Sequence, residues 1–229
     1  ILMGATLPAI SRYVEATPRG VSWMGYFYAG NIAGAVVGCL LAGFYLLREY
    51  DIVVATFTAA GIDVMVAGLA LALARFGDWE PAPEAQIPAP NLRARSPRTL
   101  LIAIAISGFV ALGSEVVWTR LMALMLGATT YTFSIILAVF LAALGVGSAL
   151  GSYLARYSKH PWTLFGACQA GAIVGVAWTA YVIAAQLPFW PINPAITNEP
   201  KFIFQLDLVR SLWALSPAPL FWGASFPLA

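Results

Sequence analysis

Five ionisable side chains lie inside or beside long apolar stretches, and they are the residues whose types could do chemistry: Asp63, Glu115, Arg120, Asp207 and Arg210. A charge at the centre of a bilayer costs about 3 kcal/mol or more. Such residues therefore pair with one another or mark the path of an ion, a proton or a substrate. Carboxylates in this setting can hold a proton or a small cation.

Two interpretations are open for each of these groups. Asp63 is near the centre of an apolar run and is either a substrate or proton site or a buried, hydrogen-bonded structural residue. We expect Glu115 and Arg120 to belong to a structural network at the membrane interface, with a role in a substrate or proton site as the alternative. Asp207 and Arg210 are three residues apart on one helix and can neutralise each other. The alternative is that this pair faces the interior of the bundle as part of a site.

Aromatic and amide side chains extend this set. If a small cation is carried, Asp63 and Glu115 are its natural partners, and aromatic faces could add cation–π attraction. The rings available for this are Trp118, Tyr131, Trp178 and Tyr181. Aromatic belts at membrane surfaces explain the same rings equally well. We interpret Asn31 and Gln169 as donors and acceptors of hydrogen bonds between helices.

The composition indicates the class of protein that holds these groups. Of the 229 residues, 61% are hydrophobic and 10% are charged, whereas soluble domains carry about 25% charged residues. This excludes a soluble globule and predicts an integral membrane protein in contact with the lipid bilayer. The net charge of +2 leaves no basic field for nucleic acid. The two cysteines lie in apolar runs and there is one histidine, so we predict no metal site.

The apolar runs predict an all-α, polytopic bundle of transmembrane helices. A span needs about 20 apolar residues. Five complete segments qualify: 24–47, 52–74, 99–118, 131–155 and 162–186. A sixth runs from about 203 to the end, and residues 1–8 are typical of the end of an earlier helix. The chain opens in the middle of this pattern, so we expect it to be a fragment of a longer protein.

Glycines recur every four residues in several of these segments. The sets are Gly30, Gly34 and Gly38; Gly147 and Gly151; and Gly171 and Gly175. This spacing keeps them on one helix face, where another backbone can approach closely. They predict helix packing, and the alternative is that these helices slide or rock against each other during transport.

Residues 76–98 change character, because they hold five prolines and three acidic residues. They predict a polar linker between two helical groups. The positive charges orient the bundle. Eight Lys and Arg residues fall on the linker side, which are Arg12, Arg19, Arg75, Arg93, Arg95, Arg98, Arg156 and Lys159, against Arg48, Arg120 and Lys201 on the other side. The linker side is therefore predicted to be cytoplasmic, in a bacterial-type inner membrane.

A short internal repeat relates the two helical groups. Residues 2–8, LMGATLP, match residues 221–227, FWGASFP, at a constant offset. Transporter folds often carry such repeats. Residues 1–75 would then hold the last helices of a first repeat, and residues 99–229 the first four helices of a second. Two repeats of six helices are the layout of the major facilitator superfamily (MFS).

Longer strings also resemble one family. GATLPAISR (4–12), YAGNIAGAVVGCLLAGF (28–44), SGFVALGSEVVWTRLMALMLGATTYTFSIILAVFLAALGVGSALG (107–151) and WGASFP (222–227) resemble the membrane part of fused MFS/spermidine-synthase proteins. The resemblance implies a C-terminal spermidine-synthase-like domain beyond Ala229, which in active members transfers an aminopropyl group from decarboxylated S-adenosylmethionine to putrescine. It also implies that the helices anchor that domain and move a small cationic, polyamine-related substrate.

These residues carry no catalytic motif of the transferase and no cofactor-binding loop. We therefore expect no catalytic residue and no cofactor in this fragment, and whether the parent protein is an enzyme stays open. The segment GSYLARYSK also departs from the facilitator pattern, which would place an Asp near Ala155. Two alternatives remain: a freestanding MFS-type secondary transporter, and a membrane scaffold that transports nothing.

Overall fold

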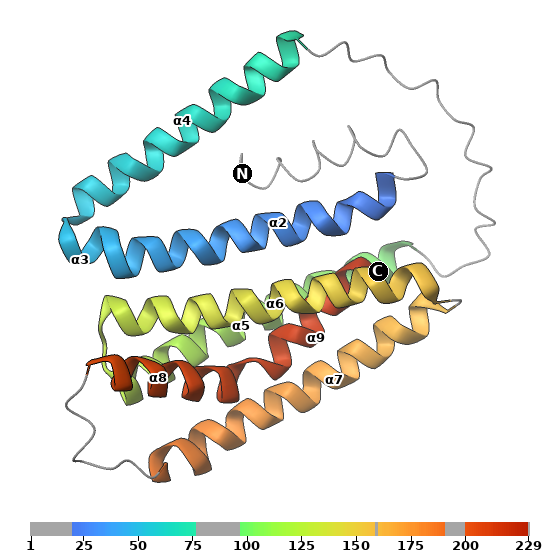
Figure 1. The fold of residues 1–229 in the computed structure, drawn as a ribbon. Coiled ribbons are helices and arrows are strands. Elements are labelled where there is room, and N and C mark those ends of the chain that lie inside the picture. Colours follow the sequence, from blue (N-terminus) through green and yellow to red (C-terminus); the bar gives the residue numbers. More distant parts are fainter. Residues whose placement is uncertain (1–19, 77–96, 159, 191–199, 229) are drawn as a thin grey trace.

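The computed structural model of the 229-residue chain describes residues 20–76, 97–158, 160–190 and 200–228. All regular elements within these ranges are helical (Figure 1). They are α2 (Gly20–Leu41), η1 (Ala42–Leu46), α3 (Leu47–Glu49), α4 (Ile52–Phe76), α5 (Pro97–Leu126), α6 (Thr130–Tyr157), α7 (Pro161–Tyr181), η2 (Val182–Gln186), η3 (Leu187–Phe189), α8 (Pro200–Leu215), α9 (Pro217–Ser225) and η4 (Phe226–Leu228). The segments η1 and η2 are π-helical, and η3 and η4 are 3₁₀ turns.

Each of the five predicted spans is helical, and five helices in the described residues are long and apolar enough to cross a membrane. They cover Phe27–Glu49, Ile52–Arg75, Ile102–Leu126, Thr130–Tyr157 and Trp162–Phe189. The described part of the chain is thus all helical and of integral-membrane character. The predicted end of the third span at residue 118 is wrong. The helix runs through Arg120 to Leu126 because that arginine is exposed and the apolar pattern continues past it.

Helix α6 lies at the centre of the packed part of the molecule, with α2, α5, α8 and α9 around it (Figure 1). Its first turn is capped by Thr129, whose hydroxyl accepts a hydrogen bond from the Thr132 amide at 3.1 Å. The turn before it requires Gly127, which has a φ of +104°. The buried core is contributed mainly by α5, α6, α8 and α9 and includes Trp118, Met122, Ile135, Ile136, Phe140, Leu215 and Trp222.

The predicted sixth span is broken into two helices. Helix α8 ends at Leu215 and α9 begins at Pro217, with Ser216 between them in helical conformation. Pro217 and Pro219 have no amide hydrogen, so two hydrogen bonds of a continuous helix cannot form there. The residues predicted to form one span therefore change direction at Ser216 (Figure 1).

Close backbone approach holds α9 between α6 and α7 (Figure 1). A Cβ added at Gly147 would overlap the Leu220 carbonyl, and one at Gly151 would overlap the Ala224 carbonyl. On the other side, a Cβ at Gly175 would lie 2.7 Å from the Ala218 Cα. A Cβ at Gly171 would lie 2.6 Å from ring atoms of Phe221. These four glycines lie at helix contacts that larger residues would obstruct.

The two long N-terminal helices differ in how they attach to the bundle. Helix α2 packs on α6 around Ile32, which would lie 2.8 Å from a Cβ at Gly145. Around Gly30, Gly34 and Gly38 no atom of the described residues comes within 4 Å of an added Cβ. Helix α4 leads away from the bundle, and none of its apolar span is buried (Figure 1). Two predicted segments lie outside the described residues. They are residues 1–8, which contain the first copy of the repeat, and residues 77–96 of the linker.

Candidate functional site

Asp207 and Arg210 form an ion pair inside the bundle. Both lie on α8, and the Nη1 atom of Arg210 is 3.7 Å from Oδ1 of Asp207. Their side chains are 8% and 11% exposed, respectively. The spacing of three residues places the two groups on the same helix face, and packing of α8 against α6 buries that face. The structure therefore brings the predicted pair together and places it in the interior.

The pair leaves hydrogen-bonding capacity unused. The Nε atom of Arg210 and the hydroxyl of the neighbouring Ser211 are both buried, and neither has a hydrogen-bond partner among the described residues. The ion pair itself is longer than the 2.7–2.9 Å typical of a charge-assisted hydrogen bond. Unpaired polar groups in a low-dielectric interior are costly. This cluster can therefore gain free energy from a solute that supplies donors or acceptors.

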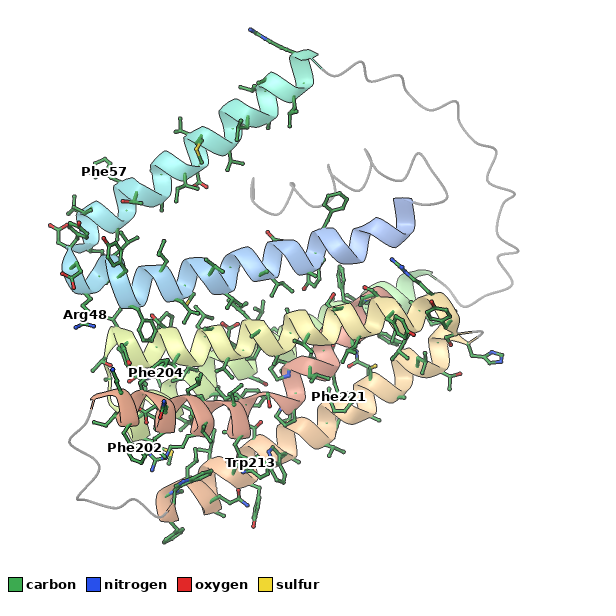
Figure 2. All side chains as sticks on the ribbon, in the orientation of Figure 1. Arg48, Phe57, Phe202, Phe204, Trp213 and Phe221 are labelled. Carbon is green, nitrogen blue, oxygen red and sulfur yellow. The ribbon has the colours of Figure 1, made fainter. Side chains whose placement is uncertain are left out.

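An aromatic cluster borders the pair. The ring of Tyr131 on α6 lies 5.8 Å from Phe204, which is three residues before Asp207 on α8. Phe44 in η1 lies 4.3 Å from Tyr131 and 5.4 Å from Phe204. The spacing of three residues between Phe204 and Asp207 places both on the same face of α8. Phe204 and Arg48 lie at the same end of the bundle (Figure 2).

The other candidate carboxylates lie elsewhere. Asp63 is exposed on α4, away from the packed helices. Glu115 is half-buried on α5, and Arg120 is exposed on the same helix. These last two form no ion pair with each other, because five residues of α-helix separate them by about 140° around the axis. The structure therefore does not bring Asp63 or Glu115 to the Asp207–Arg210 pair.

The remaining aromatic candidates are engaged in packing. Trp118 stacks on Trp222 with a ring separation of 5.9 Å. Trp178 donates a hydrogen bond from its indole nitrogen to the Trp213 carbonyl at 3.0 Å, and its ring lies 6.5 Å from that of Tyr181. Of the four rings proposed for cation–π contact, Tyr131 alone borders the ion pair.

Two parts of the site had no clear signal in the sequence. Phe44 and Phe204 are ordinary apolar residues in apolar runs, and they meet Tyr131 only because three helices converge. Ser211 follows Arg210 directly, but a single serine in a helix carries no indication that its hydroxyl is buried and unpaired. Within the described residues no three His, Cys, Asp or Glu side chains gather in an arrangement that could hold a metal ion.

The prediction for Gln169 is confirmed. Its side-chain amide nitrogen donates to the Ser107 hydroxyl at 3.1 Å, and that hydroxyl lies 3.2 Å from the amide oxygen. The contact joins α5 to α7. Asn31, by contrast, is exposed on α2.

Comparison with known proteins adds no further assignment: no protein-family model, no curated protein and no solved structure matches this chain.

Proposed function

We propose that the chain is the MFS-like membrane domain of a spermidine-synthase-like protein and that it moves a small cationic solute, of the polyamine class, across the bilayer. The observation that carries the transport proposal is the buried Asp207–Arg210 pair in an apolar helical bundle. Ionisable residues inside membranes mark solute or proton paths by default. The family assignment depends on the sequence strings and the internal repeat described above.

A cationic solute can bind the pair by replacing Arg210 as the partner of Asp207. An ammonium group that takes the place of the Arg210 guanidinium keeps the Asp207 carboxylate paired. The guanidinium must then move to water or to another counter-charge, because it would otherwise be buried without a partner. The long contact of 3.7 Å makes this exchange easier than it would be for a closely hydrogen-bonded pair. The face of Tyr131 can add cation–π attraction next to the carboxylate.

The break between α8 and α9 supports movement of the site. Helices interrupted near a binding site are a common feature of secondary transporters, in which one group of helices rocks against another. The Asp207–Arg210 pair lies on α8, ahead of the break at Ser216. A change of angle at this residue would shift the pair relative to α9, which the glycine contacts fix between α6 and α7.

Uptake by proteoliposomes tests the transport proposal. The whole protein is reconstituted, and accumulation of radiolabelled putrescine and spermidine is followed with and without a proton gradient. We expect Asp207→Asn to reduce uptake at least tenfold. The matched control is Glu49→Gln, because Glu49 is an exposed acid (57%) near the same end of the bundle. If the wild-type protein accumulates neither solute, or if both variants behave alike, the proposal is wrong.

The family assignment has a separate test. Membranes that contain the whole protein are assayed for aminopropyl transfer from decarboxylated S-adenosylmethionine to putrescine. Transfer would support the fused protein. Uptake without transfer would favour the freestanding secondary transporter, and intact folding without uptake or transfer would favour the scaffold.

A further inference from the structure

A half-open cavity of about 140 Å³ lies among α2, α5, α6, α7, α9 and η4, apart from the Asp207–Arg210 pair. Its walls are mostly apolar, and four aromatic side chains contribute to them. The main lining residues are Tyr28, Ser107, Phe165, Gln169, Trp222 and Phe226. Ser107 is five residues, or about 7.5 Å, from the start of the apolar span Ile102–Leu126. The cavity is therefore at a depth that corresponds to the hydrocarbon of the bilayer.

The size and the walls of the cavity select one kind of molecule. Apolar protein cavities of about 150 Å³ hold one benzene molecule, so this one has room for a single ring. Tyr28 and Phe226 are stacked at 4.9 Å on one side, and Trp222 is held by its contact with Trp118. Aromatic walls favour an aromatic guest through edge and face contacts. None of the lining residues carries a full charge, so a charged guest would be unpaired and strongly disfavoured.

Four lining residues carry polar side-chain groups: Tyr28, Ser107, Gln169 and Ser225. The Ser107–Gln169 hydrogen bonds use part of the capacity of the Gln169 amide, which has two N–H groups and an oxygen with two lone pairs. The hydroxyl of Ser225, which also lines the cavity, is already bonded to the Trp222 carbonyl at 2.7 Å. The amide of Gln169 therefore keeps donor and acceptor sites for a guest, and we choose it as the anchor because a single side chain offers both.

We propose that this cavity binds one neutral, single-ring molecule that carries a hydroxyl group, with the ring among the aromatic walls and the hydroxyl on Gln169. The site is independent of the proposed transport function. Its guest reaches it from the lipid, where small neutral aromatic alcohols partition readily.

Binding of radiolabelled phenol to the purified whole protein in detergent micelles tests this proposal. Equilibrium dialysis measures it, with empty micelles of the same detergent as the blank. We expect one saturable site. Ala111→Leu places three additional carbons in the cavity and should abolish that binding, because Ala111 is a lining residue. Ala105→Leu makes the same change on the exposed face of the same helix and should leave binding unchanged.

A second variant tests the hydrogen bond and does not depend on filling the cavity. Gln169→Leu should weaken phenol binding about three- to tenfold, because one hydrogen bond is lost. The same variant should leave the binding of toluene unchanged. The proposal is overturned if phenol shows no saturable binding, if Ala105→Leu and Ala111→Leu have equal effects, or if Gln169→Leu alters phenol and toluene binding alike.

Discussion

The Nη1 atom of Arg210 lies 3.7 Å from Oδ1 of Asp207, one helical turn away, and the protein covers both side chains almost completely. The two charges cancel, so the pair can exist in an apolar bundle, whereas either charge alone would be strongly disfavoured. Because each charge depends on the other, the pair can be tested through the free energy of unfolding, without a transport assay.

Asp207→Asn should lower the free energy of unfolding by about 3 kcal/mol, because it leaves the guanidinium buried without a counter-charge. The double variant Asp207→Asn/Arg210→Gln should recover part of that loss. Unfolding in mixed detergent micelles measures both. Additive effects of the two single changes would contradict the expected coupling.

Gly147→Ala and Gly151→Ala should each destabilise the protein by about 1–3 kcal/mol, because the added methyl group would overlap a carbonyl of α9. Gly113→Ala on α5 is the control, since its Cβ would meet nothing within 4 Å. That change should be neutral or stabilising, as alanine is the better helix former. Thermal unfolding in detergent distinguishes the two cases, and equal effects at all three positions would refute the close approach of α9.

Thr179→Val should cost about 1 kcal/mol of stability. The buried Thr179 hydroxyl lies 2.8 Å from the Ala214 carbonyl on α8 and 3.0 Å from the Gly175 carbonyl on its own helix. Valine keeps the shape but leaves the Ala214 carbonyl without this donor. Thr179→Ser keeps the hydroxyl and should lose less. If the serine variant is the less stable of the two, packing of the methyl group outweighs the hydrogen bond.

Single cysteines should report the predicted orientation. In a background with Cys39→Ser and Cys168→Ser, a membrane-impermeant maleimide should label Ala128→Cys in intact cells. Labelling of His160→Cys should require permeabilised cells, because that position follows the helix end on the side rich in Lys and Arg. Both positions are exposed in the structure. The reverse pattern would show that the linker side faces outward.

The spans could be predicted from the sequence because each depends only on the number of consecutive apolar residues in its own segment. The ion pair could also be predicted, since a separation of three residues fixes its geometry on one helix. The break at Ser216 was not predicted, because the span was assigned by its apolar length. That criterion does not register the amide hydrogens that Pro217 and Pro219 lack. The cavity and the cluster around Tyr131 depend on contacts between helices that are distant in the chain, and no local pattern encodes them.

The glycines of α6 also set the register of its neighbour. The row that faces α9 reads Ala143, Gly147, Gly151 and Ala155, and the Leu220 and Ala224 carbonyls lie against its two glycines. If α9 advanced by one turn in either direction, one of these carbonyls would meet the methyl group of an alanine. The two glycines thus accept the α9 carbonyls, and the alanine before them and the alanine after them exclude a carbonyl by steric overlap. This arrangement opposes sliding of α9 along α6, so we expect these two helices to move together.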